Sequence, residues 1–455
     1  MENINPSISI SNPHPDQADW VQKTGLGLVL FGLASFIIQG FGIMKHTPWF
    51  GFAISFGLVS LGSVIYSMRL YLTVPEGVKN NNIWLKSLTS RGIVAWMLGI
   101  LITIFYIVIY WYPGWLENFI RITDPLSFLL RGKVADQWFL YGCMYTVSVL
   151  IMGFKAILKY RHSNYQVIRT SSVMFFQLGF AFIIPGILQL FNQPEFYFSY
   201  FWPLKYDYLF PNTVKSLMSH PGGLGVFMVF WGAAMIFIAT PILTYFFGKR
   251  WYCSWVCGCG GLANTTGDAF RHLSDKSLKA WKIERWTVYS ILILILLTTA
   301  LLWINSFSNG TVLGNLSGNF AKFYGFFIGA VFSGVIGVGF YPILGTRVWC
   351  RFGCPMAAIL GIQQKFFSRF RITTNGGQCI SCGNCSTFCE MGIDVRAYAQ
   401  KGQNIVRASC VGCGICATVC PRGVLKLENG SVKDRVDNNP FLIGNNSTVV
   451  SGKNI

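Results

Sequence analysis

Eight long apolar runs without Asp, Glu, Lys, Arg or His occupy about half of the first 345 residues of this 455-residue chain. Hydrocarbon offers backbone polar groups no water, so such a run crosses a bilayer only as a helix or as part of a closed barrel. A helix rises about 1.5 Å per residue, so about 20 residues cross about 30 Å of hydrocarbon. The sequence therefore predicts eight transmembrane helices, over residues 24–44, 49–68, 92–112, 138–154 (which is short and is expected to extend toward Lys159), 172–192, 224–247, 287–305 and 323–345.

The Lys and Arg residues between these runs predict the orientation of the helices. The connections after the second, fourth, sixth and eighth runs hold twenty of them, and the connections after the first, third, fifth and seventh hold seven. Cytoplasmic connections retain the excess of basic residues, so both termini are expected in the cytoplasm, with the chain in a bacterial inner membrane. Residues 1–22 form a polar tail without the features of a secretory signal.

Composition also indicates a membrane protein. Hydrophobic residues make up 53% of the chain and charged residues 12%, whereas soluble proteins carry about 25% charged residues. The net charge of +19 lies mainly in the short connections, which favours contact with anionic membrane lipid and argues against nucleic acid binding. All five histidines lie outside the apolar runs and no C-x-x-C-H sequence occurs, so two-histidine intramembrane haem and c-type haem have no ligands.

Eight of the fourteen cysteines form two tandem runs of the pattern C-x2-C-x2-C-x3-C, at residues 379–389 and 410–420. This spacing is typical of [4Fe-4S] ligation, and in a two-cluster fold the fourth cysteine of each run serves the other cluster. Four-cysteine zinc sites usually come as two separated pairs, which makes zinc the weaker interpretation. The predicted ligands are Cys379, Cys382, Cys385 and Cys420 for one [4Fe-4S] cluster and Cys410, Cys413, Cys416 and Cys389 for the other.

Glu390 follows Cys389 at the position where Pro421 follows Cys420. A proline there shapes the turn and ligates nothing, so Cys389 remains a predicted ligand. Thiolate ligands favour a reducing compartment, which agrees with a cytoplasmic C-terminal region. The predicted fold is an α-helical polytopic membrane protein with a C-terminal α+β domain like a two-cluster bacterial ferredoxin. Its predicted parts are a polar tail (1–22), five transmembrane helices (23–222), three transmembrane helices with two short cysteine motifs (223–370), the ferredoxin-like domain (371–430) and a polar tail (431–455).

The short motif G-x-R-x-[YW]-C-x3-C occurs at residues 248–257 and again 97 residues later, at 345–354. An offset that encloses two helices returns the chain to the same side of the membrane, as in a parallel internal repeat. The four thiols are therefore predicted to hold a third iron-sulfur cluster. Copper(I), zinc, a redox-active dithiol and unligated cysteines are the alternatives. The thiols are Cys253, Cys257, Cys350 and Cys354, while Cys259 is interpreted as a free thiol and Cys143 as a small buried hydrophobe.

Three further features carry predictions. Residues 196–210, in the outward connection after the fifth run, are dense in aromatic rings. They predict an interfacial or re-entrant segment, or a contact surface for an extracytoplasmic partner or a quinone ring. Apolar and basic residues alternate over 270–282, which predicts a cationic amphipathic helix on the inner membrane face. Basic residues near the tandem cysteines fit an acidic docking partner or the anionic lipid surface equally well.

In these motifs the chain resembles the membrane-bound polyferredoxin family typified by NosR, NapH and CcoG. The sequence from Cys350 to Pro355 fits the family's C-x3-C-P motif, whereas the first copy has Gly258 in place of the proline. Residues 392–396 also resemble the stretch between the two cluster motifs of CcoG-type proteins. The resemblance covers about residues 224–430, and it implies a membrane-bound base that carries a cytoplasmic domain with two [4Fe-4S] clusters.

These features favour an iron-sulfur electron-transfer subunit that relays electrons between a quinone pool or a cytoplasmic donor and a partner oxidoreductase, alongside other subunits of a respiratory or reductase complex. No nucleotide-binding loop or histidine-based acid/base pair is recognised, so a component of a complex is favoured over a stand-alone enzyme. Ion-coupled transporters mark their path with intramembrane ionisable residues, which the eight runs lack. The alternative that the CcoG resemblance implies is a metal-handling assembly factor that reduces copper or delivers it to another membrane complex.

Overall fold

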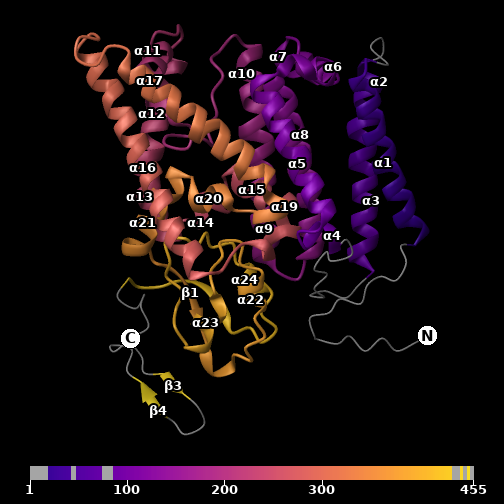
Figure 1. Cartoon of the computed structure of the whole chain (residues 1–455), viewed down its shortest axis with the longest axis vertical. Coiled ribbons are helices and arrows are strands. Elements are labelled where there is room, and N and C mark those ends of the chain that lie inside the picture. The colour runs from indigo at the N-terminus through magenta and orange to yellow at the C-terminus, as the bar shows by residue number, and fades with distance from the viewer. Residues whose placement is uncertain (1–18, 43–47, 74–85, 433–440, 444–447, 451–455) are drawn as a thin grey trace.

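The computed structural model describes residues 19–42, 48–73, 86–432, 441–443 and 448–450. Eight helices in this part of the chain are long and apolar enough to cross a membrane. Figure 1 shows them as a bundle, with the cysteine-rich C-terminal region below one end of it. In chain order they are α1 (Trp20–Gly40), α2, η1 and α3 (Pro48–Leu72), α5 (Ile93–Trp111), α8 (Gln137–Lys159), α9, η4 and α10 (Asn164–Leu190), α12, η6 and α13 (Leu224–Phe247), α16 (Leu278–Phe307), and α17, η8 and α18 (Leu316–Gly339).

Several helices extend beyond their apolar runs. The fourth helix continues to Lys159, as expected, while the fifth begins at Asn164 and the seventh at Leu278, eight or nine residues before their runs. The added turns carry charged side chains such as Lys159 and Glu284, and both of these are buried within the protein. The apolar runs therefore end the fourth helix too early and start the fifth and seventh helices too late. The other connections contain α4 (Lys86–Thr89), η3 (Pro113–Leu116), α6 (Glu117–Arg121), α7 (Asp124–Arg131), η5 (Tyr206–Leu209) and α11 (Pro211–Met218).

The predicted amphipathic helix over 270–282 is wrong. Residues Thr266–Leu273 form a 3-10 helix, η7, and residues 278–282 belong to the first turns of α16, which Ser277 caps by accepting a hydrogen bond from the Ala280 N–H. Arg271 is fully buried rather than placed at a lipid surface. A buried arginine with carboxylate partners gives the same alternation of apolar and basic residues as an interfacial helix, so the pattern alone does not separate them.

Four of the spanning helices contain a stretch with π-helical hydrogen bonding, namely η1 (Ala53–Gly57), η4 (Phe176–Ile183), η6 (Met235–Ala239) and η8 (Tyr324–Ile336). Pro185 follows η4 and Pro241 follows η6. A proline has no N–H to donate and its ring clashes with the carbonyl four residues earlier, so the helix must rearrange on its N-terminal side. Near the second of these prolines the Thr240 hydroxyl donates to the Met235 carbonyl at 2.7 Å.

The C-terminal region is built around a two-stranded antiparallel sheet. Strand β1 (Phe370–Thr374) pairs with β2 (Leu425–Asn429), with Ile372 opposite Leu427, so the sheet joins the two ends of the cysteine-rich segment. Between the strands lie three short helices, α22 (Asn384–Thr387), α23 (Val395–Gln400) and α24 (Ile415–Thr418). Buried apolar side chains from this segment, including Ile393 and Val411, form one core with residues of the cysteine motifs beside the membrane helices. A further hairpin pairs β3 (Phe441–Ile443) with β4 (Thr448–Val450).

The two C-x3-C motifs have the same local structure. In each, a helix (α13, Thr240–Phe247, or α19, Tyr341–Leu344) ends at a glycine with positive φ, at Gly248 (φ 66°, ψ −171°) and at Gly345 (φ 89°, ψ 178°). A short helix then carries the first cysteine, and the second cysteine caps the next helix. These helices are α14 (Arg250–Cys253) and α15 (Gly258–Asn264) in the first copy, and α20 (Val348–Phe352) and α21 (Pro355–Phe367) in the second.

We expect Gly345→Ala to destabilise the protein by about 1–3 kcal/mol, because a non-glycine residue at this backbone conformation is strained. The added Cβ would also lie 2.5 Å from the Ser274 Oγ and 2.8 Å from the Ser274 backbone nitrogen. The midpoint of thermal unfolding of the purified protein measures the effect. Gly27→Ala in α1 is the control, because its Cβ meets no atom within 4 Å. Equal midpoints for the two variants would contradict the role given to the turn.

Candidate metal centres

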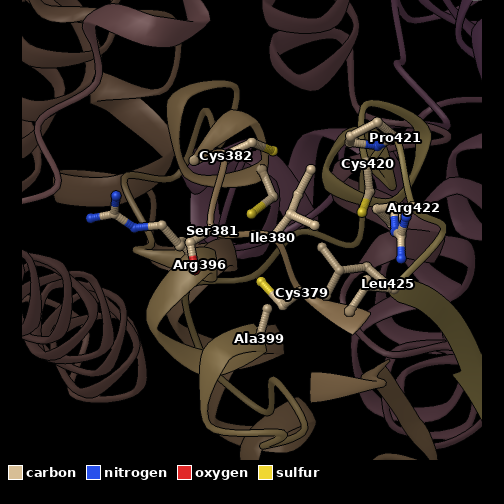
Figure 2. A pocket seen from close by; sticks show the side chains of 13 residues that line it. Cys379, Ile380, Ser381, Cys382, Arg396, Ala399, Cys420, Pro421, Arg422 and Leu425 are labelled. Atoms are coloured by element: carbon tan, nitrogen blue, oxygen red, sulfur yellow. The ribbon is translucent and has the colours of Figure 1, made fainter. Parts of the chain in front are cut away.

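Four of the tandem cysteines line a cavity with about 350 Å³ of empty space in the C-terminal region. Figure 2 shows three of them, Cys379, Cys382 and Cys420, gathered around this cavity. The fourth, Cys385, is 8% exposed; burial raises its pKa to about 11, and it interacts electrostatically with the other three thiols. This is the set that crossed ligation requires, with three cysteines from the first run and the last cysteine of the second.

A second cavity, with about 380 Å³ of empty space, is lined by Cys389, Cys410, Cys413 and Cys416. Burial raises the pKa of Cys410 to about 11 and that of Cys389 to about 12. Backbone amides point at the same two sulfurs: the Gly412 N–H donates to Cys410 Sγ and the Ile393 N–H to Cys389 Sγ, each at 3.4 Å. Buried thiols with raised pKa values become thiolates when a metal centre supplies positive charge.

The four cysteines of the two C-x3-C motifs also come together. Each is buried, with 6–8% of its surface exposed, and Cys354 interacts electrostatically with Cys253, Cys257 and Cys350. Burial raises the pKa of Cys253 to about 12. Cys354 caps α21 and its Sγ accepts a hydrogen bond from the Ala357 N–H at 3.4 Å. Pairs from two distant parts of the chain therefore form one set of four thiols.

The remaining two cysteines lie in different surroundings. Cys259 lies beside the C-x3-C set, and its hydrogen bond with Cys257 lowers the pKa of Cys257 to about 7. Cys143 is 1% exposed within α8, where it packs as the expected small hydrophobe. Cys259 thus adds a fifth thiol next to the four that the repeat supplies.

The chemistry of the three cysteine sets fits cubane clusters. Within the described ranges, no three His, Cys, Asp or Glu side chains converge closely enough to hold a single metal ion. A single zinc ion needs its thiolates about 2.3 Å from one point, whereas a cubane is held at its corners and takes more widely separated thiolates. Each of the three sets supplies the four thiolates that a cubane takes.

Buried cations surround the cysteines and match the negative charge that thiolate clusters would bring. Arg169, on α9 (Asn164–Phe175), is 1% exposed, interacts electrostatically with Cys413, and has no hydrogen-bond partner at Nε or Nη1. Arg347 lies with Nη1 3.6 Å from Cys350 Sγ. Lys249 is 2% exposed and interacts electrostatically with Cys253 and Cys410. A buried cation with unsatisfied nitrogens, such as Arg169, is costly, so an anionic group beside it is the expected complement.

Glu390 is the residue whose importance the sequence pattern did not reveal. Its side chain is fully buried between two arginines, with Oε2 2.6 Å from Arg271 Nη1 and Oε1 2.7 Å from Arg347 Nη2. Arg271 continues the network by donating from Nε to Asp268 at 2.7 Å, and Lys159 donates to the same carboxylate at 2.6 Å. Glu390, at the position that breaks the proline pattern, therefore ties the C-terminal region to Arg271 of η7 and to Arg347 of the second C-x3-C motif.

Direct hydrogen bonds join the second cavity to the C-x3-C set. The Ser254 hydroxyl, inside the first C-x3-C motif, donates to the Val411 carbonyl at 2.6 Å. Gln364 of α21 donates to the Cys410 carbonyl at 2.8 Å, and Gln166 of α9 donates to the Cys413 carbonyl at 2.8 Å. Cys416 of the second cavity interacts electrostatically with Cys385 of the first. The three cysteine sets thus form one continuous row.

The aromatic segment 196–210 reaches this row from the opposite end of the bundle. Phe196, Ser199, Phe201, Trp202 and Tyr208 are buried. The Tyr252 hydroxyl, one residue before Cys253, donates to the Ser199 carbonyl at 2.8 Å. The segment is therefore re-entrant, and these five side chains are not an open contact surface. Contact with an extracytoplasmic partner through its other residues stays a prediction.

Comparison with protein families agrees with this geometry. A 4Fe-4S dicluster domain matches residues 371–421. A 4Fe-4S binding domain matches twice, at residues 229–277 and 325–373, and each match contains one C-x3-C motif. The chain thus carries 4Fe-4S binding regions. The double match falls on the two copies that share their turn geometry.

One curated relative extends the comparison. YccM of Escherichia coli (strain K12), which is named as a candidate electron transport protein, is 26% identical over 170 residues. The matched region covers 36% of this chain and 47% of YccM, so the chain spans about half the length of that relative. No solved structure matches this chain. The domains and this relative together support an iron-sulfur electron-transfer role.

Proposed function

We propose that this protein is a membrane-bound electron-transfer subunit in which three [4Fe-4S] clusters relay single electrons between a soluble surface and the membrane base. The proposal rests on the continuous row of cysteine sets, because electron transfer between clusters requires that the clusters lie close together. It needs no catalytic group between them. The proposed ligands are Cys379, Cys382, Cys385 and Cys420 for cluster 1, Cys389, Cys410, Cys413 and Cys416 for cluster 2, and Cys253, Cys257, Cys350 and Cys354 for cluster 3.

Burial supports the order of the relay. Three of the four cysteines of cluster 1 are partly exposed, cluster 2 has two buried and two partly exposed, and all four of cluster 3 are buried. This difference in burial supports exchange between cluster 1 and a partner from solution, and between cluster 3 and a group at the membrane. When bound, the clusters supply one-electron chemistry, while the protein holds their thiolates and excludes water from clusters 2 and 3.

The orientation proposed for the chain follows from its basic residues. The excess of Lys and Arg after the even-numbered helices supports cytoplasmic termini in a bacterial inner membrane. The cysteine row then lies on the cytoplasmic side, where thiolates stay reduced. We further propose that cluster 3 exchanges electrons with a quinone or with a partner subunit of a respiratory or reductase complex, since it lies next to the helix ends.

Metal and redox analysis of the full-length protein, purified anaerobically in lipid nanodiscs, tests the proposal. Three cubanes predict about twelve irons and about twelve labile sulfides per chain, and dithionite should produce the paramagnetic resonance of reduced cubanes. Adding a water-soluble quinone to the reduced protein should then bleach that signal. Iron-free protein, or clusters that dithionite cannot reduce, would contradict an electron-transfer role. The copper-handling alternative instead predicts stoichiometric copper(I) at the C-x3-C cysteines, lost when these cysteines are replaced by serine.

A further inference from the structure

The open side of the cluster 1 cavity carries positive charge around an exposed apolar residue. Its lining includes Arg396 and Arg422 and contains no Asp or Glu. Ile380, between the first two cysteines, keeps 57% of its surface exposed. Figure 2 shows Arg396 and Arg422 on opposite sides of Ile380, at the edge of the cavity that holds Cys379 and Cys420. We call Ile380, Arg396 and Arg422 the cluster 1 patch.

The acidic group closest to the patch in the chain is already engaged. Asp394, two residues before Arg396, accepts a hydrogen bond from the Ser386 hydroxyl at 2.6 Å. Glu428 lies opposite Arg371 in the β1–β2 pair. Lys401 at the end of α23 and Lys426 on β2 are exposed and add positive charge to the same region. The surface over cluster 1 is therefore basic, with an apolar centre.

The position of the patch favours a soluble partner over lipid. Arg396 belongs to α23, which Figure 1 shows on the side of the C-terminal region that faces away from the helical bundle. Cations that bind a membrane surface are expected near the helix ends, because the attraction falls off within a Debye length of about 8 Å. An exposed apolar residue within a charged rim is the usual anatomy of a protein interface.

We propose that the cluster 1 patch is the docking surface for an acidic one-electron carrier protein, of the ferredoxin or flavodoxin type. This inference rests on the proposed function and names its soluble partner. In the step one electron leaves the reduced carrier and reduces cluster 1, and no bond or proton changes place. Opposite charges raise the rate of such encounters and lose their effect with added salt.

Stopped-flow reduction of the full-length protein in nanodiscs tests the patch, with an acidic plant-type [2Fe-2S] ferredoxin as the probe. At an ionic strength of about 10 mM, where the Debye length is about 30 Å, Arg396→Glu with Arg422→Glu should lower the second-order rate constant at least tenfold. The salt dependence of the rate should flatten in the same variant. Lys279→Glu with Lys282→Glu is the matched control, because these exposed lysines of α16 do not line the cavity. The control should stay within twofold of the wild type.

Three outcomes would overturn the inference. The double variant could react at the wild-type rate with wild-type salt dependence, or the control could lose as much rate as the patch variant. The effect of the patch variant could also occur only in nanodiscs of anionic lipid and vanish in zwitterionic ones, which would assign the patch to the membrane surface. Iron content and reduction by dithionite, measured in parallel, separate these results from failure of the relay, since a missing patch effect with intact clusters leaves the proposed function standing.

Discussion

Replacing Glu390 by glutamine will destabilise the protein by about 3–5 kcal/mol, the usual cost of removing one partner from a buried ion pair. The substitution leaves Arg271 and Arg347, both fully buried, without the carboxylate that lies 2.6 and 2.7 Å from them. Arg271 keeps Asp268 as a partner, but Arg347 loses its carboxylate where the C-terminal region meets the second C-x3-C motif, so the contact between these parts should fail first. Thermal unfolding followed through cluster absorbance will show the lower midpoint, together with earlier loss of iron.

Glu428→Gln is the matched control, because it removes the same charge from an exposed position on β2. Its midpoint should equal that of the wild type, and an equal midpoint for Glu390→Gln would refute the ion-pair argument. Burial acts to raise the pKa of Glu390, but Arg271 and Arg347 outweigh it and hold the pKa below its usual value. The stability that Glu390 contributes is therefore complete above about pH 4.3, the pKa of unfolded Glu, and is lost as the pH falls through the lower folded value. The difference between wild type and Glu390→Gln should shrink in that acidic range.

Substituting Cys253 and Cys350 together by serine will remove cluster 3 and interrupt the relay at its membrane end. One cysteine is lost from each repeat, so neither motif can retain the cluster alone, and iron should fall from about twelve to about eight per chain. Clusters 1 and 2 should still accept electrons from dithionite, while oxidation by a water-soluble quinone should slow at least a hundredfold. Metal analysis, paramagnetic resonance and the quinone reaction measure these three effects.

Cys143→Ala is the control for that double variant, because Cys143 is buried in α8 away from the motifs. It should keep all its iron and its reaction with quinone. A double serine variant with undiminished iron would show that the C-x3-C cysteines hold no cluster. Loss of iron from all three sets would instead mean that cluster 3 is needed for assembly of the others.

The cysteine spacing anticipated how the cysteines group in space, while cluster ligation by them stays a prediction. Both tandem sets line the cavities that crossed ligation requires, and the two short motifs meet as their repeat implied, because ligand spacing and topological offset are properties of sequence order. Hydropathy located the eight long helices. It started the fifth and seventh eight or nine residues too late, since it does not recognise polar turns, such as those around Arg169 and Glu284, that are buried by other parts of the protein.

Residues whose role depends on a distant partner could not be found in this way. Glu390 was interpreted only as a missing proline, because its meaning comes from Arg271 and Arg347, 119 and 43 residues away. Arg271 was assigned to a lipid-facing helix for the same reason. One signal for Arg347 was available in the sequence. The G-x-R pattern that both motif copies share includes this arginine, but only the cysteines of the motif were given a role.

The buried Glu390 network also constrains how the protein is made. Arg271 and Arg347 emerge from the ribosome well before residue 390, so their charges have no carboxylate from the C-terminal region while the membrane helices are being inserted. The C-terminal region can pack against the helical bundle only after both repeats have been inserted. Only then do all twelve cysteines of the row come together. The two tandem sets draw on residues 379–420, so insertion of iron and sulfide into them is a late event in biogenesis, and a ribosome stalled before residue 390 would leave a metal-poor, readily degraded intermediate in the membrane.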